Sequence, residues 1–323
     1  MLSNDSSTLP VWRSLLFVPV NVRKFVDKAA ACGADAIVLD LEDSIAPADK
    51  ALARTLIGEA CAAVGTGGAD ILVRVNRPLE LAVPDIEAAV SPQVTALMLP
   101  KVASASHIRL LAELVATVEA RKGMRVGHTR FYAVVESVQA FPHMFEIAAA
   151  HPRIAAFTCG TEDFTASTGS QPDPDVLLYP KQQGVMAASA AGVMPLGIFA
   201  SSANFRDLEA YRQAVAHSRR FGVVGSACIH PSQVPILNQG FSPSASDIEA
   251  AQRVIDTYTE AIAQGRGSIA LDGKMLDVPV VQRSERVLEI ARRIARRQAA
   301  RSQSSSGQSS LPETVRRVGG REP

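Results

Sequence analysis

The apolar residues of this chain fall into short runs that recur along its first two thirds. Each run is almost continuously apolar, which is typical of parallel strands buried on both faces. Eight such runs stand at 14–18, 36–41, 71–75, 96–99, 131–135, 154–158, 194–199 and 223–227. Alanine-rich stretches with a helical pattern lie between them, for example at 24–32, 50–64, 104–121, 144–150 and 207–219. The pattern therefore predicts strands and helices in alternation.

Eight strands that alternate with helices predict an α/β fold, a (β/α)8 TIM barrel over residues 11–240. A doubly wound open sheet is the competing arrangement, because it shows the same alternation. The barrel is favoured because its usual length is about 250 residues, and because polar residues follow the strands at regular intervals. These stand 27 to 35 residues apart, at Glu42, Arg74, Lys101, Glu136 and Asp163. Barrel enzymes form their active sites from such strand ends, so we expect these side chains to converge.

The pattern changes beyond the barrel, and residues 241–300 are predicted to form a small helical lid. A Ser-rich capping segment precedes a helix from Asp247 to about Gln264. A short extended segment then turns at Asp272-Gly273, and a second helix runs from about Val280 to Ala299. Residues 301–323 are rich in Ser, Gln, Gly and Arg, so we expect a disordered tail.

The composition narrows the class of protein. Of the 323 residues, 47% are hydrophobic and 20% are charged, which is enough apolar surface for a globular core. A net charge of +1 and 5% aromatic residues give no sign of a nucleic-acid partner. Residues 1–10 are polar, so we expect a flexible N-terminus without a secretory signal. No apolar stretch approaches the ~20 residues that span a membrane. Four scattered cysteines fit a reducing compartment, so we expect a cytoplasmic protein without a membrane partner.

Two carboxylates at neighbouring strand ends, Glu136 and Asp163, are the predicted metal ligands. Like charges at such a place repel unless a cation lies between them, and hard oxygen ligands favour Mg²⁺. Two protein ligands suffice, because Mg²⁺ keeps several waters and accepts substrate oxygens. The alternative is a pair of surface carboxylates that cap the following helices.

Arg74 ends a buried strand, and a buried guanidinium needs a partner. It is predicted to hold a carboxylate or to stabilise an enolate oxygen. A structural pairing with Glu42 or Asp43 is the other interpretation, and both can hold together. Lys101 and His230 also follow strands and are further candidates, although His230 is more typical of a residue that shapes the barrel rim.

Four basic residues, Arg13, Arg23, Lys24 and Lys50, are placed by strand order around the first two β–α loops. Such a patch suits the phosphates of a nucleotide-bearing cofactor. A solvated face is the default for such charges, and the chain has no phosphate-binding glycine motif to support the patch.

Eight motifs occur in order along the chain. They are Arg13–Pro19, Gly33–Asp43 with Pro47 and Lys50, Arg74–Asn76, Leu99–Lys101, Glu136, Gly160–Asp163, Ile229–Gln233 and Asp272–Asp277. Together they resemble the citrate lyase beta-subunit-like proteins of the HpcH/HpaI aldolase superfamily over roughly residues 11–297. Malyl-CoA and citramalyl-CoA lyases belong to the same group.

The resemblance implies a barrel with a C-terminal lid, bound Mg²⁺, a coenzyme A thioester substrate and a homotrimer or hexamer whose lids are exchanged between subunits. It assigns Glu136 and Asp163 to the metal and Arg74 to the reacting group. Asp277, on the lid, matches an acid/base that enters a neighbouring subunit's site. The residues implied along coenzyme A are Phe17, Arg23, Lys24 and Lys50.

The implied activity is a carbon–carbon lyase that reversibly splits a malyl-CoA or citramalyl-CoA type ester into acetyl- or propionyl-CoA and a 2-keto acid. The alternatives are a hydrolase of malyl-CoA-like thioesters, an aldolase acting on non-CoA hydroxy-keto acids, and a non-enzymatic acyl-CoA-binding protein. The chain departs from the family pattern at Val20 and Val22, where Gly and Pro are usual. Acids are missing at 165–169 and 194–197, and Lys181 replaces an arginine. These changes predict an unusual substrate rather than an inactive enzyme.

Overall fold

The computed structural model of the 323-residue chain describes residues 9–203, 205–266 and 269–307. The chain divides into two compact units, Met1–Ser242 and Pro243–Pro323. Each unit is described by itself below. Among the described residues, none of the helices combines the length and the apolar character that a membrane crossing requires.

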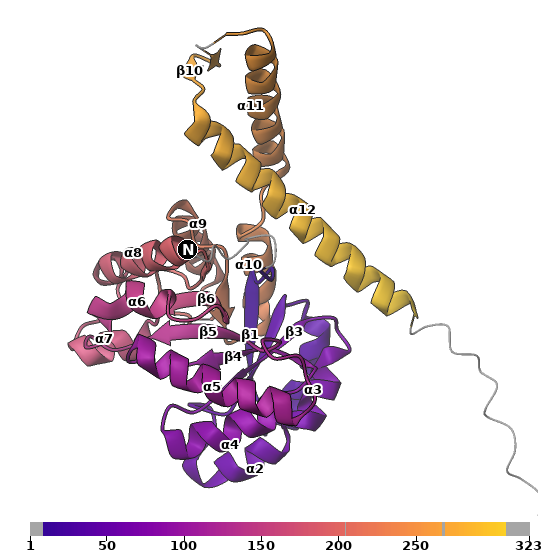
Figure 1. Ribbon diagram of the computed structural model, residues 1–323, viewed down its shortest axis with the longest axis vertical. Helices are drawn as coiled ribbons and strands as arrows, with labels where there is room; N and C mark the ends of the chain where they lie inside the picture. The colour runs from indigo at the N-terminus through magenta and orange to yellow at the C-terminus, as the bar shows by residue number, and fades with distance from the viewer. Residues whose placement is uncertain (1–8, 204, 267–268, 308–323) are drawn as a thin grey trace, which may run out of the picture. The chain divides into compact units, whose positions relative to one another are not determined.

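The first unit is built on one parallel sheet of eight strands, in the order β7-β6-β5-β4-β3-β2-β1-β8 (Figure 1). The strands are β1 Ser14–Pro19, β2 Ala36–Asp40, β3 Asp70–Arg74, β4 Val94–Leu99, β5 Arg130–Val135, β6 Ile154–Cys159, β7 Met194–Pro195 and β8 Ser226–Cys228. The two edge strands, β7 and β8, meet through a parallel bridge between Leu196 and Gly225. A backbone hydrogen bond of 2.9 Å from Gly197 N to Gly225 O supports this bridge. The sheet thus closes as the predicted TIM barrel.

Helices surround the strands. They are α1 Arg23–Ala29, α2 Lys50–Thr55, α3 Ile57–Gly65, α4 Leu79–Ala89, α5 Ala105–Arg121, α6 Met144–Ala148, α7 Glu162–Thr168, α8 Pro174–Ala191, α9 Leu208–Arg220 and α10 Val234–Gly240. The long helices α4 and α8 lie between predicted strands, as the alternation of strands and helices requires. Each carries an internal proline, Pro84 in α4 and Pro180 in α8, which reads as a helix breaker in the sequence alone.

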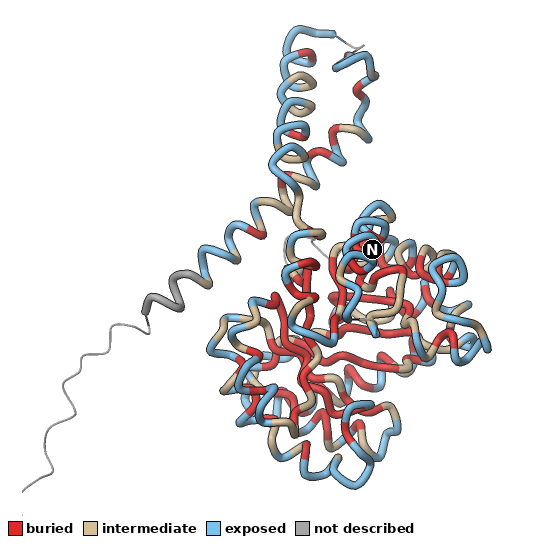
Figure 2. Tube along the Cα trace, turned by 180° about the vertical axis from the view of Figure 1, so that it is seen from behind, coloured by how far each residue is buried: buried red, intermediate tan, exposed pale blue. Residues whose placement is uncertain are grey.

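Both faces of the strands are buried, which explains why the runs are continuously apolar. Along β2, Ala36 and Val38 face the barrel interior, in a cluster that includes Trp12 and Tyr132. Ile37 and Leu39 lie in the larger cluster formed with residues of the helices. Figure 2 shows the strands of this unit as a buried centre inside a more exposed layer.

The second unit contains α11 Ala245–Ala263, a hairpin of β9 Ala270–Leu271 and β10 Lys274–Met275, and α12 Val278–Gly307. The hairpin turns at Asp272 and Gly273, which both have positive φ, as a two-residue type I′ turn requires. Helix α12 ends at Gly307, beyond the predicted end at Ala299. Residues 301–307 are therefore helical, and the rest of the predicted tail, like residues 1–8, lies outside the described residues.

Candidate active site

The carboxyl ends of β2 and β3 hold a bidentate ion pair. Asp40 and Arg74 are register partners, so their side chains leave the sheet side by side. Arg74 Nε and Nη2 donate to the two carboxylate oxygens of Asp40, each at 2.7 Å. Burial acts to raise the pKa of Asp40, but the hydrogen bonds and the charge of Arg74 outweigh it and the pKa is lowered. The guanidinium plane is therefore fixed by Asp40, a partner that the sequence analysis did not single out.

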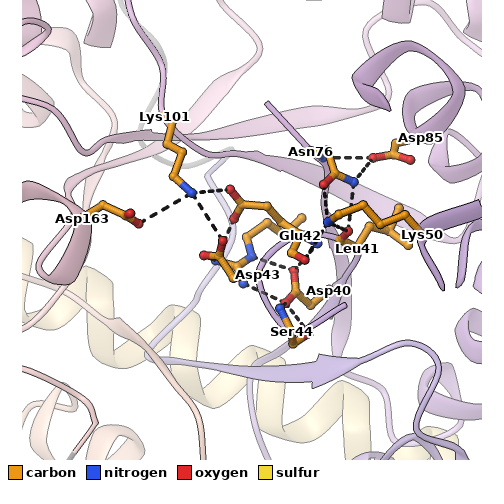
Figure 3. A network of polar contacts seen from close by, with 11 residues as sticks. Asp40, Leu41, Glu42, Asp43, Ser44, Lys50, Asn76, Asp85, Lys101 and Asp163 are labelled. Atoms are coloured by element: carbon orange, nitrogen blue, oxygen red, sulfur yellow. Dashed lines mark hydrogen bonds and ion pairs between the residues drawn. The ribbon is translucent and has the colours of Figure 1, made fainter. Parts of the chain in front are cut away.

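A chain of alternating charges extends from this pair across the strand ends (Figure 3). Arg74 Nη1 lies 3.0 Å from Glu42 Oε2 and 3.2 Å from Asp43 Oδ2, so the predicted pairing with these acids is confirmed. Lys101 Nζ lies 2.7 Å from Glu42 Oε1, 3.4 Å from Asp43 Oδ1 and 3.8 Å from Asp163 Oδ2. These contacts connect the ends of β2, β3 and β4 with the first turn of α7.

Glu136, which follows β5, is held from two sides. Its Oε2 accepts a 2.8 Å hydrogen bond from the backbone N–H of Lys101, a residue in the left-handed region with φ of 50°. On the other side lies Gly160, which follows β6. A Cβ on Gly160 would stand 2.5 Å from Glu136 Cγ, so only glycine leaves room for this side chain. The role of Gly160 is visible only in three dimensions.

The environment of Glu136 and Asp163 fits a divalent cation. Burial, and then the charge of Asp163, raise the pKa of Glu136 to about 7. A cation between the two carboxylates would remove this repulsion, and their oxygens are the donors that Mg²⁺ prefers. Among the described residues no group of three or more His, Cys, Asp or Glu side chains is arranged to hold a metal. Mg²⁺ bound to two carboxylates would keep several waters and accept substrate oxygens as its other ligands.

The prediction that Arg13 belongs to the basic patch is wrong. Arg13 precedes β1, so it lies at the amino end of the barrel, whereas the residues that follow a strand lie at the carboxyl end. Its side chain is 6% exposed and forms a bidentate ion pair with Asp35, at 2.7 and 2.9 Å. Strand order placed Arg13 near β1 but could not say at which end.

The ammonium group of Lys50 binds groups of the chain itself and has no hydrogen left for a phosphate. Its Nζ donates to the carbonyl oxygens of Leu41 and Glu42, at 3.1 and 2.9 Å, and to Asn76 Oδ1 at 2.6 Å. These three bonds account for all three ammonium hydrogens. Lys50 therefore ties the loop after β2 to the end of β3.

The other residues assigned to coenzyme A lie in or beside the first β–α loop. Phe17 is half-buried in β1, and the Arg74 guanidinium carbon lies 4.6 Å from the centre of its ring. Arg23 is exposed and pairs with Asp27 at 2.7 Å and with Glu59. Lys24 is exposed on α1.

His230 and Asp277 both cap helical segments. His230 Nδ1 contacts Ser232 Oγ at 2.7 Å, and its ring stacks on Phe205 with centroids 4.9 Å apart, in keeping with the rim role expected for it. Asp277 lies in the second unit, and its Oδ1 accepts the backbone N–H of Val280 at 3.1 Å at the start of α12. Its assignment as an acid/base stays a prediction.

Two of the departures from the family pattern, Lys181 and Gly197, are neighbours behind the end of β6. Lys181 is 5% exposed, and its Nζ donates to Cys159 O at 2.6 Å. Gly197 has φ of 98°, and a Cβ there would stand 2.5 Å from Thr158 Oγ1 and 3.5 Å from Lys181 Nζ. Lys181 and Gly197 therefore pack together beside the end of β6, and the absence of a Cβ at Gly197 leaves room for the Thr158 side chain.

Comparison with known proteins identifies the family. Residues 13–231 match the model of the HpcH/HpaI aldolase/citrate lyase family. The citrate lyase subunit beta of Leuconostoc mesenteroides subsp. cremoris is 34% identical over 285 residues, which cover 86% of this chain and 93% of that protein. Two proteins of Cereibacter sphaeroides are also similar. One is an L-malyl-CoA/beta-methylmalyl-CoA lyase, 32% identical over 88% of this chain and 95% of its own length. The other is a (3S)-malyl-CoA thioesterase, 33% identical over 82% of this chain and 90% of its own length.

A solved structure supports the same assignment. CitE from Mycobacterium tuberculosis, in complex with magnesium, acetoacetate and coenzyme A, superimposes with a TM-score of 0.68 at 27% identity. The match covers 88% of this chain and 99% of that one. The sequence motifs, the barrel and these similarities agree that the chain belongs to the HpcH/HpaI aldolase/citrate lyase family and is a lyase.

Proposed function

We propose that the protein is a Mg²⁺-dependent CoA-ester lyase. It would reversibly cleave a small 3-hydroxyacyl-CoA, of the malyl-CoA or citramalyl-CoA type, to acetyl- or propionyl-CoA and a 2-keto acid. The observation that carries the proposal is the gathering of Glu136, Asp163, Arg74 and Lys101 at the carboxyl ends of the strands. The similarity to a citrate lyase subunit and to a malyl-CoA lyase supports it, as do the magnesium and coenzyme A in the CitE complex.

In this proposal Glu136 and Asp163 hold the metal. The backbone N–H of Lys101 fixes one oxygen of Glu136, and Gly160 leaves room for its side chain. Mg²⁺ bound there would act as a Lewis acid toward the carboxylate and hydroxyl or keto oxygens of the substrate.

Arg74 would stabilise the charge that develops when the carbon–carbon bond breaks. That bond joins the hydroxyl-bearing carbon to the carbon next to the thioester carbonyl. Its electron pair moves into an acyl-CoA enolate, whose oxygen a guanidinium can hold, while the hydroxyl group would give up its proton to water and become the keto group of the 2-keto acid. Asp40 holds two N–H groups of Arg74 at 2.7 Å, so little reorganisation is needed when the charge appears.

Proton transfer and the binding of coenzyme A are assigned to residues by the family resemblance. Asp277, on the lid of a neighbouring subunit in a homotrimer or hexamer, would transfer a proton to the enolate carbon. Phe17, Arg23 and Lys24 would lie along coenzyme A, while Lys50 supports the loop rather than the ligand. A cytoplasmic location stays a prediction from the sequence.

A substrate panel tests the proposal. The full chain is incubated with malyl-CoA, citramalyl-CoA or β-methylmalyl-CoA, with Mg²⁺ or with EDTA, and keto acid, acyl-CoA and free thiol are measured. We expect keto acid and acyl-CoA in equal amounts, only with Mg²⁺, and a loss of at least 100-fold in Glu136→Gln. If no ester of the panel is cleaved or formed, or if Glu136→Gln is as active as the parent, the proposal is wrong.

Thioester hydrolysis is the second candidate, because the (3S)-malyl-CoA thioesterase of Cereibacter sphaeroides is 33% identical to this chain. The same panel separates the two activities. Free thiol without keto acid would identify a hydrolase, whereas cleavage of hydroxy-keto acids in the absence of coenzyme A would identify a free-standing aldolase.

A further inference from the structure

A hollow lies at the amino end of the barrel, at the opposite end of the strands from the candidate active site. Its volume is about 410 Å³, and it is lined by residues of α5 and by the segments that lead into β5 and β6. Sites for small organic ligands typically have volumes of 300–1,000 Å³. The hollow is therefore large enough for a small molecule and shares no lining residue with the site described above.

Basic side chains dominate the charged part of the lining. Arg125 and Arg130 lie on the segment that leads into β5 and on its first residue. Within the part of the chain that the structure describes, neither guanidinium has an ion pair or a side-chain hydrogen bond. Arg153 also lines the hollow, but it is buried and neutralised by Glu119 at 2.7 Å. The lining contains one acidic residue, the exposed Glu113.

His151 adds a directed hydrogen-bond donor. Its Nδ1 accepts the backbone N–H of Arg153 at 3.1 Å, so in the neutral ring the hydrogen sits on Nε2. Burial, followed by the charges of Arg153 and Arg109, lowers the pKa of His151, so the neutral ring with its Nε2–H donor is favoured. An anion in the hollow would accept a hydrogen bond from this donor.

The remaining lining is apolar. It consists of Ala112 and Ala116 on α5, Val126, Gly127 and Pro152. Val126 is 55% exposed, although a valine usually gains by leaving water. A ligand with an apolar body would cover this side chain while its charged group meets the arginines.

We propose that this hollow binds a small organic anion, with its phosphate or carboxylate group on Arg125 and Arg130 and its apolar body against Val126. Arginine forks bind both groups by paired hydrogen bonds, so the two anions share one recognition chemistry. The inference does not depend on the lyase reaction, because none of these residues belongs to the proposed catalytic machinery.

Calorimetric titration of the full chain with phenyl phosphate and with benzoate tests the proposal, with benzyl alcohol as an uncharged comparison. Excess EDTA keeps the ligands from binding through a metal. We expect saturable binding of at least one anion, weakened by added salt, and none of the alcohol. The tighter of the two anions identifies the preferred group. Failure of both anions to bind would overturn the proposal.

Variants locate the binding. Arg125→Gln with Arg130→Gln should weaken the anion at least tenfold, and Val126→Glu, at an exposed position, should do the same by repulsion. Arg212→Gln is the matched control, because Arg212 is an exposed arginine on α9 that is absent from the lining. Lyase activity should be unchanged in all of them. Equal affinity in the parent and in the Val126→Glu protein would refute the assignment even if the double variant fails to fold.

Discussion

Replacement of Gly160 by alanine is expected to disable the proposed metal site through a single methyl group. The new Cβ would stand 2.5 Å from Glu136 Cγ, whereas ordinary contact begins at 3.4 Å. The Glu136 side chain must therefore move by about 1 Å, since ordinary contact distances must be restored. Gly160 is not among the glycines with positive φ, so its backbone accepts alanine without strain.

The expected magnitude follows from that displacement. A misplacement of about 1 Å at a catalytic group costs up to about 100-fold in rate, and loss of support around a metal ligand costs about 10- to 100-fold in affinity. We expect kcat/KM to fall about 100-fold, or about 2.7 kcal/mol, and the Mg²⁺ concentration for half-maximal activity to rise at least tenfold. The thermal unfolding midpoint should change by only a few degrees.

Steady-state kinetics over a Mg²⁺ titration measure this effect. Gly58→Ala is the matched control, because a Cβ on Gly58 in α3 meets nothing within 4 Å. A double-mutant cycle with Glu136→Ala tests the mechanism, since this variant has no Cγ to be displaced. Gly160→Ala should then add little to the loss already caused by Glu136→Ala. Full activity of Gly160→Ala, or additive losses in the double variant, would refute the reasoning.

Three further predictions concern the ion pairs. Asp40→Asn should lower kcat/KM about 100-fold, because it removes the bidentate ion pair that fixes Arg74. The matched variant Asp43→Asn, at an exposed position, should lower kcat/KM less than tenfold, and steady-state kinetics compare the two variants. The pKa of Glu119 is held at about 2, because its hydrogen bonds, first to Arg153, outweigh burial. Glu119 therefore contributes about 3 kcal/mol to the free energy of unfolding above pH 4.5, and this contribution is lost as the pH falls toward 2. Urea unfolding at a series of pH values measures the loss, and the free energy of unfolding of Glu119→Gln should not show it. Arg13→Met should lower the free energy of unfolding by about 3–5 kcal/mol, because it strands a buried carboxylate, but leave KM for the CoA ester unchanged. If the KM rises under conditions in which the Arg13→Met protein is fully folded, Arg13 contributes to ligand binding and the prediction is wrong.

The sequence alone located most strands of the barrel, because a strand buried on both faces must be apolar at consecutive positions. It also indicated the residues at the strand ends, since the carboxyl ends of a parallel barrel meet at one rim. The bounds of helices such as α4 and α8 came only from the structure, since both helices continue through internal prolines that neighbouring packing tolerates.

Only the tertiary structure decided which charged groups face each other. Arg13 directly precedes β1 and Lys50 begins the helix α2 that follows β2. Arg13 nevertheless lies at the far rim, and Lys50 uses all its donors inside the fold. Asp40 and Gly160 act on Arg74 and Glu136 from neighbouring strands, over separations of more than twenty residues. Local patterns record whether a position is apolar or polar, but contacts across a barrel depend on strand register and on the direction of each side chain. The sequence therefore determined the barrel and the family, and the folded chain determined how its charges are arranged.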